Sequence, residues 1–328
     1  LTGISDKVWW DKNTRDSLTF GGKCYSLLGD VSLMLAESHY VLFQNKDIAA
    51  NIGLDNIYDT VKSGKWTLDI LGEHLKKAAQ DTNGNGKMDF EDRWGLGIYQ
   101  VAMTYFMLAG ENPIVSTDSD GIPYFNGVDE RTADMYNKIF TTLYDQQYTA
   151  IGGTKNVPSG KDWKTPFMEG RSLYLFEPLG HSKKMRDSKF DFAIIPMPKY
   201  DEAQEDYISL LANWGTTLMV VPSSVSDLSR TATILDAMAY DSHISLMEPY
   251  YNAYLMQKGT RNDDSAEMLG IISRTRTLAS DVILGWTSDI ETALINTLNT
   301  GDTAVASKIA ALKDKSIAKI EKDIEKYE

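Results

Sequence analysis

The chain has 328 residues, 42% of them hydrophobic, which is enough for two lobes with separate cores. Its formal net charge is −13 and no basic run occurs, which argues against nucleic acid and anionic membrane surfaces as partners. No stretch approaches the about 18 apolar residues of a membrane-spanning helix, and Leu1 does not open a signal peptide. Cys24 is the only cysteine, so neither an internal disulfide nor a thiolate metal cluster is expected.

The pattern of apolar residues predicts an α/β protein in which short strands and longer helices follow one another. The expected strands are Cys24–Leu28, Tyr40–Phe43, Leu96–Tyr99, Ser172–Phe176, Phe192–Ile195 and Thr217–Val221. The expected helices run from the N-cap Thr67 toward Gln80, over residues 131–148, 228–240 and 265–278, and from Val305 onward. The loops between them are short and not repetitive, so two lobes would be joined by crossing strands.

Residues 81–92 predict a calcium loop. Oxygen-bearing side chains occupy the alternating positions of a twelve-residue EF-hand loop, with Gly86 at the sharp turn and a backbone carbonyl available from Lys87. Hard oxygen ligands suit Ca²⁺ better than a softer metal. Asp92 departs from the pattern, because Glu is the usual closing ligand. The expected ligands are Asp81, Asn83, Asn85, Lys87, Asp89 and Asp92. A polar turn without metal is the alternative reading.

The sequence offers no positive case for catalysis. It contains no nucleophile elbow, zinc-binding histidine pair or phosphate-binding glycine loop, and its four histidines are scattered. Aromatic residues are instead frequent near expected loops and strand ends. Flat rings beside acids and amides suit a sugar, whose C–H faces stack while its hydroxyls form hydrogen bonds. Most such rings, however, simply fill cores.

Several segments resemble one family. They are Y-V-L-F-Q-N-K-D at Tyr40–Asp47, I-G-L-D at Ile52–Asp55, G-K-W-T-L-D at Gly64–Asp69, F-M-E-G-R-S-L-Y-L-F at Phe167–Phe176, I-P-M-P at Ile195–Pro198, P-Y-Y-N at Pro249–Asn252 and D-D-S-A-E-M-L at Asp263–Leu269. In order and spacing, from about Trp9 onward, they are similar to the extracellular solute-binding proteins of ABC importers, in particular the sugar-binding group (family 1). Members of that family ordinarily carry a secretion signal and more of lobe one before the equivalent of Trp9.

The resemblance implies a type II periplasmic-binding-protein fold: two α/β lobes, strands crossing between them as a hinge, and a ligand in the cleft. Lobe one, expected to be incomplete, would hold residues 1–40 and 213–285, and lobe two residues 44–211 and 287–328. The implied function is capture of a sugar or oligosaccharide, without catalysis, by a monomeric lipoprotein outside the cell or in the periplasm. The loaded protein would dock on the membrane permease of an ABC transporter.

The same layout implies six ligand-binding residues near the lobe crossings and on lobe-two loops, whereas Trp66 is assigned to packing. The six are Asp30, Tyr99, Trp163, Glu177, Trp214 and Trp286. Two other classes of function remain open. One is a carbohydrate-active enzyme on a calcium-stabilised scaffold, and the other is a calcium-dependent surface or adhesion module. For the leading reading, the calcium ion braces the binding lobe and takes no part in ligand capture.

Overall fold

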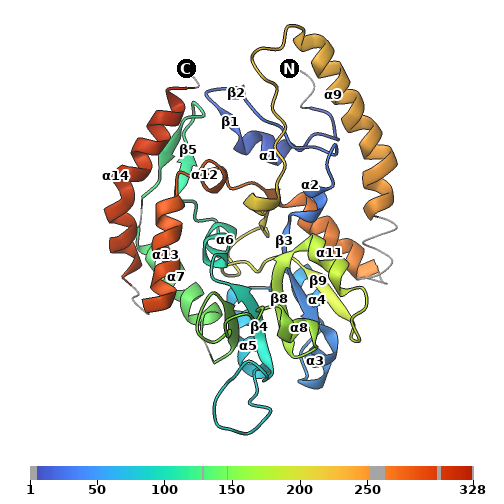
Figure 1. Ribbon diagram of the computed structural model, residues 1–328, viewed down its shortest axis with the longest axis vertical. Coiled ribbons are helices and arrows are strands. Elements are labelled where there is room, and N and C mark those ends of the chain that lie inside the picture. Colours follow the sequence, from blue (N-terminus) through green and yellow to red (C-terminus); the bar gives the residue numbers. More distant parts are fainter. Residues whose placement is uncertain (1–5, 128, 146, 252–262, 301–303, 327–328) are drawn as a thin grey trace.

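The computed structural model describes residues 6–127, 129–145, 147–251, 263–300 and 304–326. A five-stranded mixed sheet forms the lower half of the molecule in Figure 1, and helices surround it. Its strands are β3 (Tyr40–Asn45), β4 (Trp94–Tyr99), β7 (Thr149–Gly152), β8 (Ser172–Pro178) and β9 (Phe192–Ile195), in the order β7-β4-β8-β3-β9. β4 is parallel to β7 and β8, whereas β3 is antiparallel to β8 and β9. β3 therefore runs against the four other strands.

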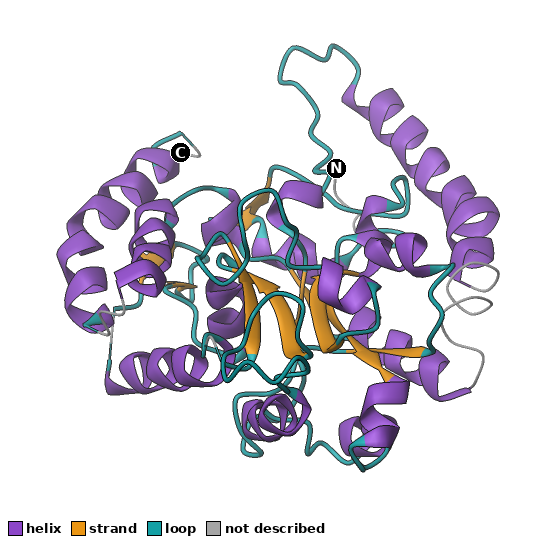
Figure 2. Ribbon diagram, turned by 60° about the horizontal axis from the view of Figure 1, so that its bottom comes forward, coloured by secondary structure: helices purple, strands orange, loops and turns teal. Residues whose placement is uncertain are grey.

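Helices cover the sheet on both sides (Figure 2). They are α3 (Lys46–Asn51), α4 (Ile57–Lys62), α5 (Leu68–Ala78), α6 (Ala102–Ala109), α7 (Glu130–Leu143), α8 (Thr165–Met168), the 3₁₀ helix η1 (Leu179–Met185) and α11 (Asp263–Arg274). Along β3 the side chains alternate: Leu42 packs in the larger core with α5 and α6, and Phe43 packs in a second core with α8 and η1. Because both faces are buried, the strands read as continuous apolar runs.

The helix α5 illustrates why the local sequence folds as it does. The Thr67 hydroxyl accepts the backbone N–H of Ile70 and caps the helix, as the sequence predicts. Leu71 and Leu75, one turn apart, are fully buried on its inner face. The backbone of Leu75 lies so close to Gly95 of β4 that a Cβ there would fall 2.7 Å from the Leu75 Cα. Glycine at 95 therefore sets the distance between α5 and the sheet.

The remaining elements lie above and beside the sheet in Figure 1. They are α1 (Lys12–Ser17), β1 (Thr19–Phe20), β2 (Lys23–Cys24), α2 (Met34–Glu37), β5 (Val115–Thr117), β6 (Pro123–Phe125), β10 (Ser209–Leu210), the 3₁₀ turn η2 (Asn213–Gly215), α9 (Leu228–Ser242), the π-helix η3 (His243–Met247), β11 (Arg276–Thr277), α12 (Ser280–Ile283), α13 (Ser288–Thr300) and α14 (Val305–Ile324). α13 packs against α6, and α14 packs against α7 and α13. The C-terminal helices thus join the body built around the sheet.

Three chain segments lie side by side where the sheet meets the upper elements. His39 forms an antiparallel bridge with Leu211, and the Ala212 N–H donates to the Ser38 carbonyl at 2.8 Å. β10 in turn pairs in parallel with β11. We call α1, β1, β2 and α9, at the top of Figure 1, the upper elements. The chain passes between them and the body that carries the five-stranded sheet at residues 38–40, 209–212 and 276–277.

Most expected elements are present, but some differ. The helices expected over residues 131–148 and 265–278 end at Leu143 and Arg274, and Arg276–Thr277 form the strand β11. Residues 25–28 and 217–221 form no continuous strand: Leu27 and Met219 meet in a single antiparallel bridge. Their pairing does not extend beyond this one bridge, so neither segment forms a ladder strand. Part of the P-Y-Y-N match, Asn252, lies outside the described residues.

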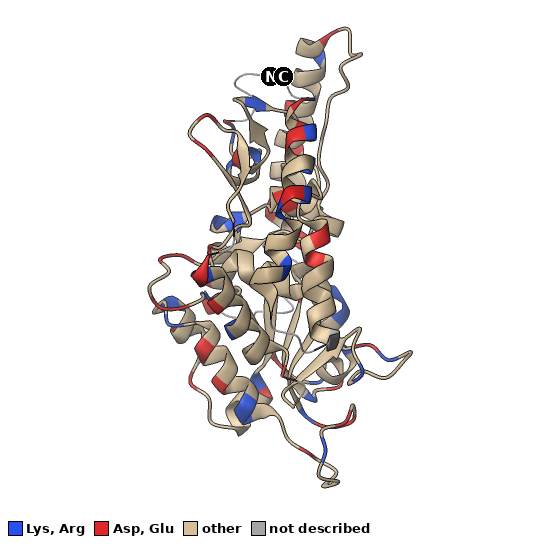
Figure 3. Cartoon of the chain, turned by 90° about the vertical axis from the view of Figure 1, so that its left-hand side faces the viewer, with Lys and Arg blue, Asp and Glu red and all other residues tan. Residues whose placement is uncertain are grey.

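The surface carries both signs of charge. Figure 3 shows Lys and Arg interspersed with Asp and Glu along the helices on the α13 and α14 side of the molecule. No helix in the described part of the chain combines the length and apolar character needed to cross a membrane.

Candidate functional site

One edge of the central sheet gathers the chain ends that build a pocket. β4, β7 and β8 are parallel and finish at this edge, where Tyr99, Gly152 and Glu177 stand at or near their carboxyl ends. β3 runs the other way and begins there, because Tyr40 pairs with Pro178. In open α/β sheets, ligands bind outside the carboxyl ends of the strands. The topology therefore points to this edge.

A cavity of about 440 Å³ opens at this edge. Five aromatic side chains and four polar ones account for most of its lining: Tyr40, Tyr99, Trp163, Phe176 and Trp214, with Lys164, Glu177, His181 and Lys184. We call it the edge pocket. Rings with a few converging polar groups are the usual composition of a small-molecule site.

One wall of the edge pocket is a pair of tilted rings. The Tyr99 and Trp163 centroids are 4.7 Å apart at an interplanar angle of 36°. Both rings rest on Gly152, where a Cβ would overlap the Trp163 ring and lie 2.8 Å from Tyr99 Cδ2. Only glycine at 152 leaves room for this arrangement.

A second, buried pair of rings in the lining begins at the first residue of β3. The Tyr40 ring stacks on Phe176 with centroids 4.7 Å apart and planes within 8°. The Trp214 Nε1–H donates to the Tyr40 hydroxyl at 3.1 Å, although the Trp214 side chain is 71% exposed. Burial raises the pKa of Tyr40 to about 12, so its hydroxyl keeps its proton at neutral pH. Trp214 is thus tethered at its polar edge while its faces remain open to solvent.

Glu177 is the carboxyl of the edge pocket. Burial raises its pKa to about 7, against the smaller opposing effect of Lys164. Its Oε1 accepts the Trp163 Nε1–H at 3.2 Å and lies 4.0 Å from Lys164 Nζ. His181 Nδ1 lies 3.7 Å from Oε2, but burial lowers the pKa of His181 to about 4, so this ring is neutral near neutrality. Glu177 can therefore either accept a hydrogen bond from a ligand hydroxyl or donate one.

The structure brings together four of the six residues expected to bind ligand: Tyr99, Trp163, Glu177 and Trp214. Trp286 does not line the edge pocket. It is 1% exposed, packs against Phe20, and donates its Nε1–H to Asp323 at 2.9 Å, so its assignment to the cleft is corrected to a core position.

Asp30 also lies outside the edge pocket. Its Oδ2 is 2.5 Å from His243 Nδ1, on the side of the molecule where Trp9 packs against α9. Trp66, expected to be a packing residue, is fully buried and donates to the Pro196 carbonyl at 3.0 Å.

The sequence analysis missed five pocket residues: Tyr40, Phe176, Lys164, His181 and Lys184. Tyr40 and Phe176 read as strand-core residues. The period of two places Phe176 and Pro178 on one face of β8, but only the strand register, with Leu42 and Tyr40 opposite them, brings Tyr40 and Phe176 into the same lining.

In the loop at residues 81–92, side-chain oxygens accept hydrogen bonds from N–H groups of the same loop. Asp81 accepts the backbone N–H groups of Gly84 and Gly86 at 2.6 and 2.7 Å, and Gly86 has a φ of +79°, as a sharp turn requires. The amides of Asn83 and Asn85 both donate to Asp89 Oδ2, at 2.9 and 2.8 Å. Three of the expected ligand side chains, Asn83, Asn85 and Asp89, thus form one small network, and Asp81 holds the turn beside it.

Asp92 behaves differently from a closing metal ligand. It is fully buried, and its two oxygens accept the backbone N–H groups of Thr82 and Asp89, each at 2.8 Å. Within the described residues, no three His, Cys, Asp or Glu side chains are grouped as a metal site would need. A cation at this loop would depend on Asp81, Asp89 and the amide oxygens of Asn83 and Asn85, each of which has two lone pairs. Asp92 then serves to close the loop.

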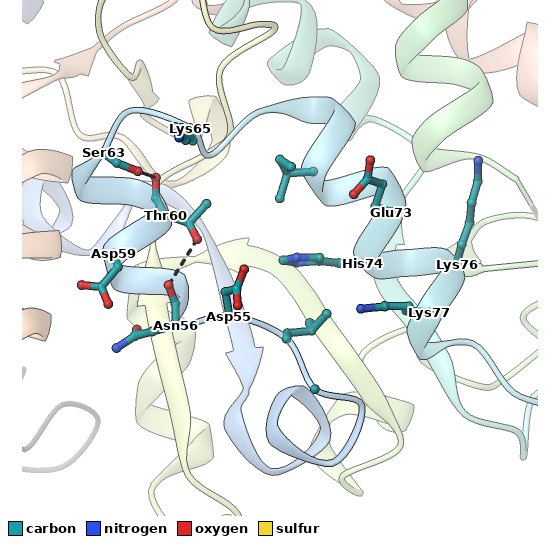
Figure 4. A pocket seen from close by; sticks show the side chains of 13 residues that line it. Asp55, Asn56, Asp59, Thr60, Ser63, Lys65, Glu73, His74, Lys76 and Lys77 are labelled. Atoms are coloured by element: carbon teal, nitrogen blue, oxygen red, sulfur yellow. Dashed lines mark hydrogen bonds between the residues drawn. The ribbon is translucent and has the colours of Figure 1, made fainter.

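A larger hollow of about 1000 Å³ lies between α4 and α5 (Figure 4). Its described lining is polar and holds a single ring, His74, whose Nδ1 is 2.8 Å from the Tyr174 hydroxyl. Burial lowers the pKa of His74 to about 4. Charged side chains such as Asp55 and Lys77 stand on opposite sides of the hollow in Figure 4. This hollow offers no stacked aromatic wall, so the edge pocket is the better candidate for a sugar.

No model of a known protein family matches this sequence, and no curated protein does. Solved structures do resemble the fold. The sugar-binding protein MalE from the phytopathogen Xanthomonas citri aligns with a TM-score of 0.64 and 11% identity, over 99% of this chain and 78% of its own. An ABC substrate-binding protein from Listeria monocytogenes, in complex with cycloalternan, gives a TM-score of 0.60 and 15% identity, over 97% and 77%.

A third neighbour shows that this fold is not confined to sugars. UgpB from Mycobacterium tuberculosis, in complex with glycerophosphocholine, aligns with a TM-score of 0.60 and 16% identity, over 98% of this chain and 78% of its own. At these identities the likeness establishes the fold alone. The chain has the two-lobe α/β fold of periplasmic binding proteins, which confirms the fold class predicted from the sequence.

Proposed function

We propose that this protein is a solute-binding protein that captures a carbohydrate in the edge pocket, without chemical conversion, and delivers it to the permease of an ABC transporter. The observation that carries this proposal is the aromatic lining of the edge pocket at the carboxyl edge of the sheet. Tyr99, 37% exposed, and Trp214, 71% exposed, offer ring surface to the C–H groups of a sugar, and Glu177, which accepts the Trp163 Nε1–H, can bind hydroxyls.

The position of the pocket supports a closing motion. Tyr40 directly follows the paired residues 38 and 39, and Trp214 follows Ala212, which bonds to Ser38. A ligand that contacts both Tyr40 and Trp214 touches a residue of the five-stranded sheet and a residue of the segment that leads back to the upper elements. Ligand binding would favour the conformation in which both contacts form, by shifting the population between open and closed states. We infer that residues 38–40, 209–212 and 276–277 form the hinge.

The test is a panel of neutral and charged oligosaccharides, measured by thermal shift and calorimetry. A ligand that binds only the native state raises the melting temperature by mass action. Trp163→Ala should lower the affinity of the ligand found by about tenfold or more, since a stacked aromatic contributes on the order of 1 kcal/mol beyond its buried area. Trp9→Ala, outside the pocket, is the matched control and should leave affinity unchanged. Turnover of any glycan, or an equal loss in both variants, would refute the proposal.

We further propose that residues 81–92 hold a Ca²⁺ ion that braces the body carrying the sheet. The fit of the loop supports this: Gly86 provides the turn, the Asp81 carboxylate accepts the Gly86 N–H, and the amide groups of Asn83 and Asn85 meet at the Asp89 carboxylate. The loop connects α5 to β4, and Tyr99 ends that strand in the edge pocket. We also propose that the protein captures its ligand outside the cell or in the periplasm, as a monomeric lipoprotein.

A further inference from the structure

A second cavity adjoins the edge pocket. It measures about 520 Å³ and is lined by residues 152–155 and 157–161 of the loop after β7, together with Trp163. Trp163 lines both cavities, so the two spaces are adjacent along the edge formed by β8, β4 and β7. We call the second space the side pocket. Together the two spaces can hold more than one sugar unit, with an indole at the junction.

The charge of this lining is opposite to that of the protein. The chain has 33 Lys and Arg against 46 Asp and Glu. The two pockets together are lined by four lysines, Lys155, Lys161, Lys164 and Lys184, and by a single acidic residue, Glu177. Concave sites with charges of one sign focus the electrostatic field and raise the local concentration of ligands of the other sign.

Three of the four lysines are available to a ligand. Lys164 is engaged, since its Nζ lies 3.0 Å from Asp162 and 3.6 Å from the centroid of the Trp163 ring. The side chains of Lys155, Lys161 and Lys184 form no salt bridge or hydrogen bond with any residue that the structure describes, and all three residues are exposed. Lys161 Nζ lies 5.8 Å from the centroid of the Phe90 ring, a longer contact than that of Lys164 with Trp163. The acidic residue does not oppose an anion strongly, because burial favours the neutral form of Glu177.

We propose that the ligand is an anionic oligosaccharide that spans both pockets. Sugar units occupy both pockets beside Trp163, while negatively charged substituents meet Lys155 and Lys161 in the side pocket and Lys184 in the edge pocket. This inference rests on the proposed carbohydrate-binding function and specifies its ligand class. Carboxylates of uronic acids and sulfate esters share the required chemistry, because each presents negatively charged oxygens to an ammonium group.

The experiment compares matched ligands by calorimetry. A uronic-acid tetrasaccharide and its carboxyl-reduced form make one pair, and a sulfated tetrasaccharide and its desulfated form make the other. The charged member should bind at least about tenfold more tightly, and salt should weaken only its binding, because exposed ion pairs are screened. The pair that shows this difference identifies the substituent as carboxylate or sulfate.

Charge-removing variants locate the effect. Lys155→Gln combined with Lys161→Gln should reduce the affinity for the charged tetrasaccharide about tenfold and leave the neutral form within about twofold. Lys76→Gln combined with Lys77→Gln removes the same charge from the α4–α5 hollow and should change neither affinity. Melting curves of both double variants check that they are folded.

The outcomes separate the two proposals. If neutral tetrasaccharides bind as tightly as charged ones, or if the Lys155 and Lys161 changes have no effect on the charged ligand, the anionic class is wrong and carbohydrate binding stands. If no carbohydrate of either kind binds, the proposed function fails and this inference fails with it.

Discussion

Removing the carboxyl of Glu177 should change how the stability of this protein depends on pH. Burial raises the pKa of Glu177 from 4.5 in the unfolded chain to about 7 in the folded protein. Between these values the folded state keeps a proton that the unfolded state has lost, so the free energy of unfolding falls as the pH rises. Below about pH 4.5 both states are protonated and the group has no effect. Well above pH 7 the carboxyl is ionised in both states, and its full destabilising contribution to the free energy of unfolding is present.

The size of this effect follows from the interval between the two pKa values. At 1.36 kcal/mol per pKa unit, the interval from 4.5 to about 7 corresponds to about 3 kcal/mol. The side chain is only 13% exposed, so solvent screening reduces this figure little. Under about 1 kcal/mol is expressed at pH 5, and nearly all of it at pH 8. Glu177→Gln keeps an acceptor oxygen for the Trp163 Nε1–H but never ionises.

Urea unfolding of the native protein and of Glu177→Gln, at several values from about pH 5 to about pH 8, measures the difference. The variant should be more stable, by under about 1 kcal/mol at the acidic end and by about 3 kcal/mol at the basic end. Glu202→Gln, at an exposed position, is the matched control and should give a constant difference. If the Glu177→Gln difference is also constant with pH, the carboxyl is not held in a desolvated site and the description of the edge pocket is wrong.

Three further predictions concern the pocket and the loop. Gly152→Ala should displace the Trp163 and Tyr99 rings and weaken ligand binding about tenfold or more, with a small change in melting temperature. An unchanged affinity would contradict the packing of these rings on Gly152. Ligand should shift the fluorescence of the exposed Trp214 to shorter wavelength, and Trp214→Phe should abolish that component, whereas an identical shift in the variant would place closure elsewhere. Chelation should lower the melting temperature, and Asp81→Ala should remove the sensitivity to chelator; identical melts with and without chelator would leave residues 81–92 as a polar turn.

The sequence predicts those elements whose signal is local. The Phe192–Ile195 strand forms as expected, and Thr67 caps α5, because an apolar run and a capping hydroxyl act over a few residues. The runs at 24–28 and 217–221 are also rich in apolar residues, but beyond Cys24, which ends β2, they meet only in the Leu27–Met219 bridge. Pairing is a tertiary property, so composition alone does not decide it.

The same division applies to the candidate site. Tyr99 and Glu177 are predictable because strand ends are recognisable and ligands gather at one edge of such sheets. Tyr40 is not, since nothing local distinguishes it from a core residue until its register with Pro178 is known. The position of Trp286 is not predictable either, because an indole near a chain crossing suits a cleft as well as a core. Its contact with Phe20, which is distant in the sequence, places it in a core.

The central place of β3 has a consequence for how the chain folds. β3 ends at Asn45, yet its two neighbours in the sheet are β8, which begins at Ser172, and β9, which begins at Phe192. The edge of this apolar strand that faces β8 stays unpaired until the ribosome has made residues through Pro178, and the edge that faces β9 until it has made residues through Ile195. Contacts between such distant residues slow folding, and unpaired strand edges favour aggregation. Fragments ending before Phe192 should therefore associate with chaperones or aggregate, whereas chains extended past Ile195 can complete the sheet.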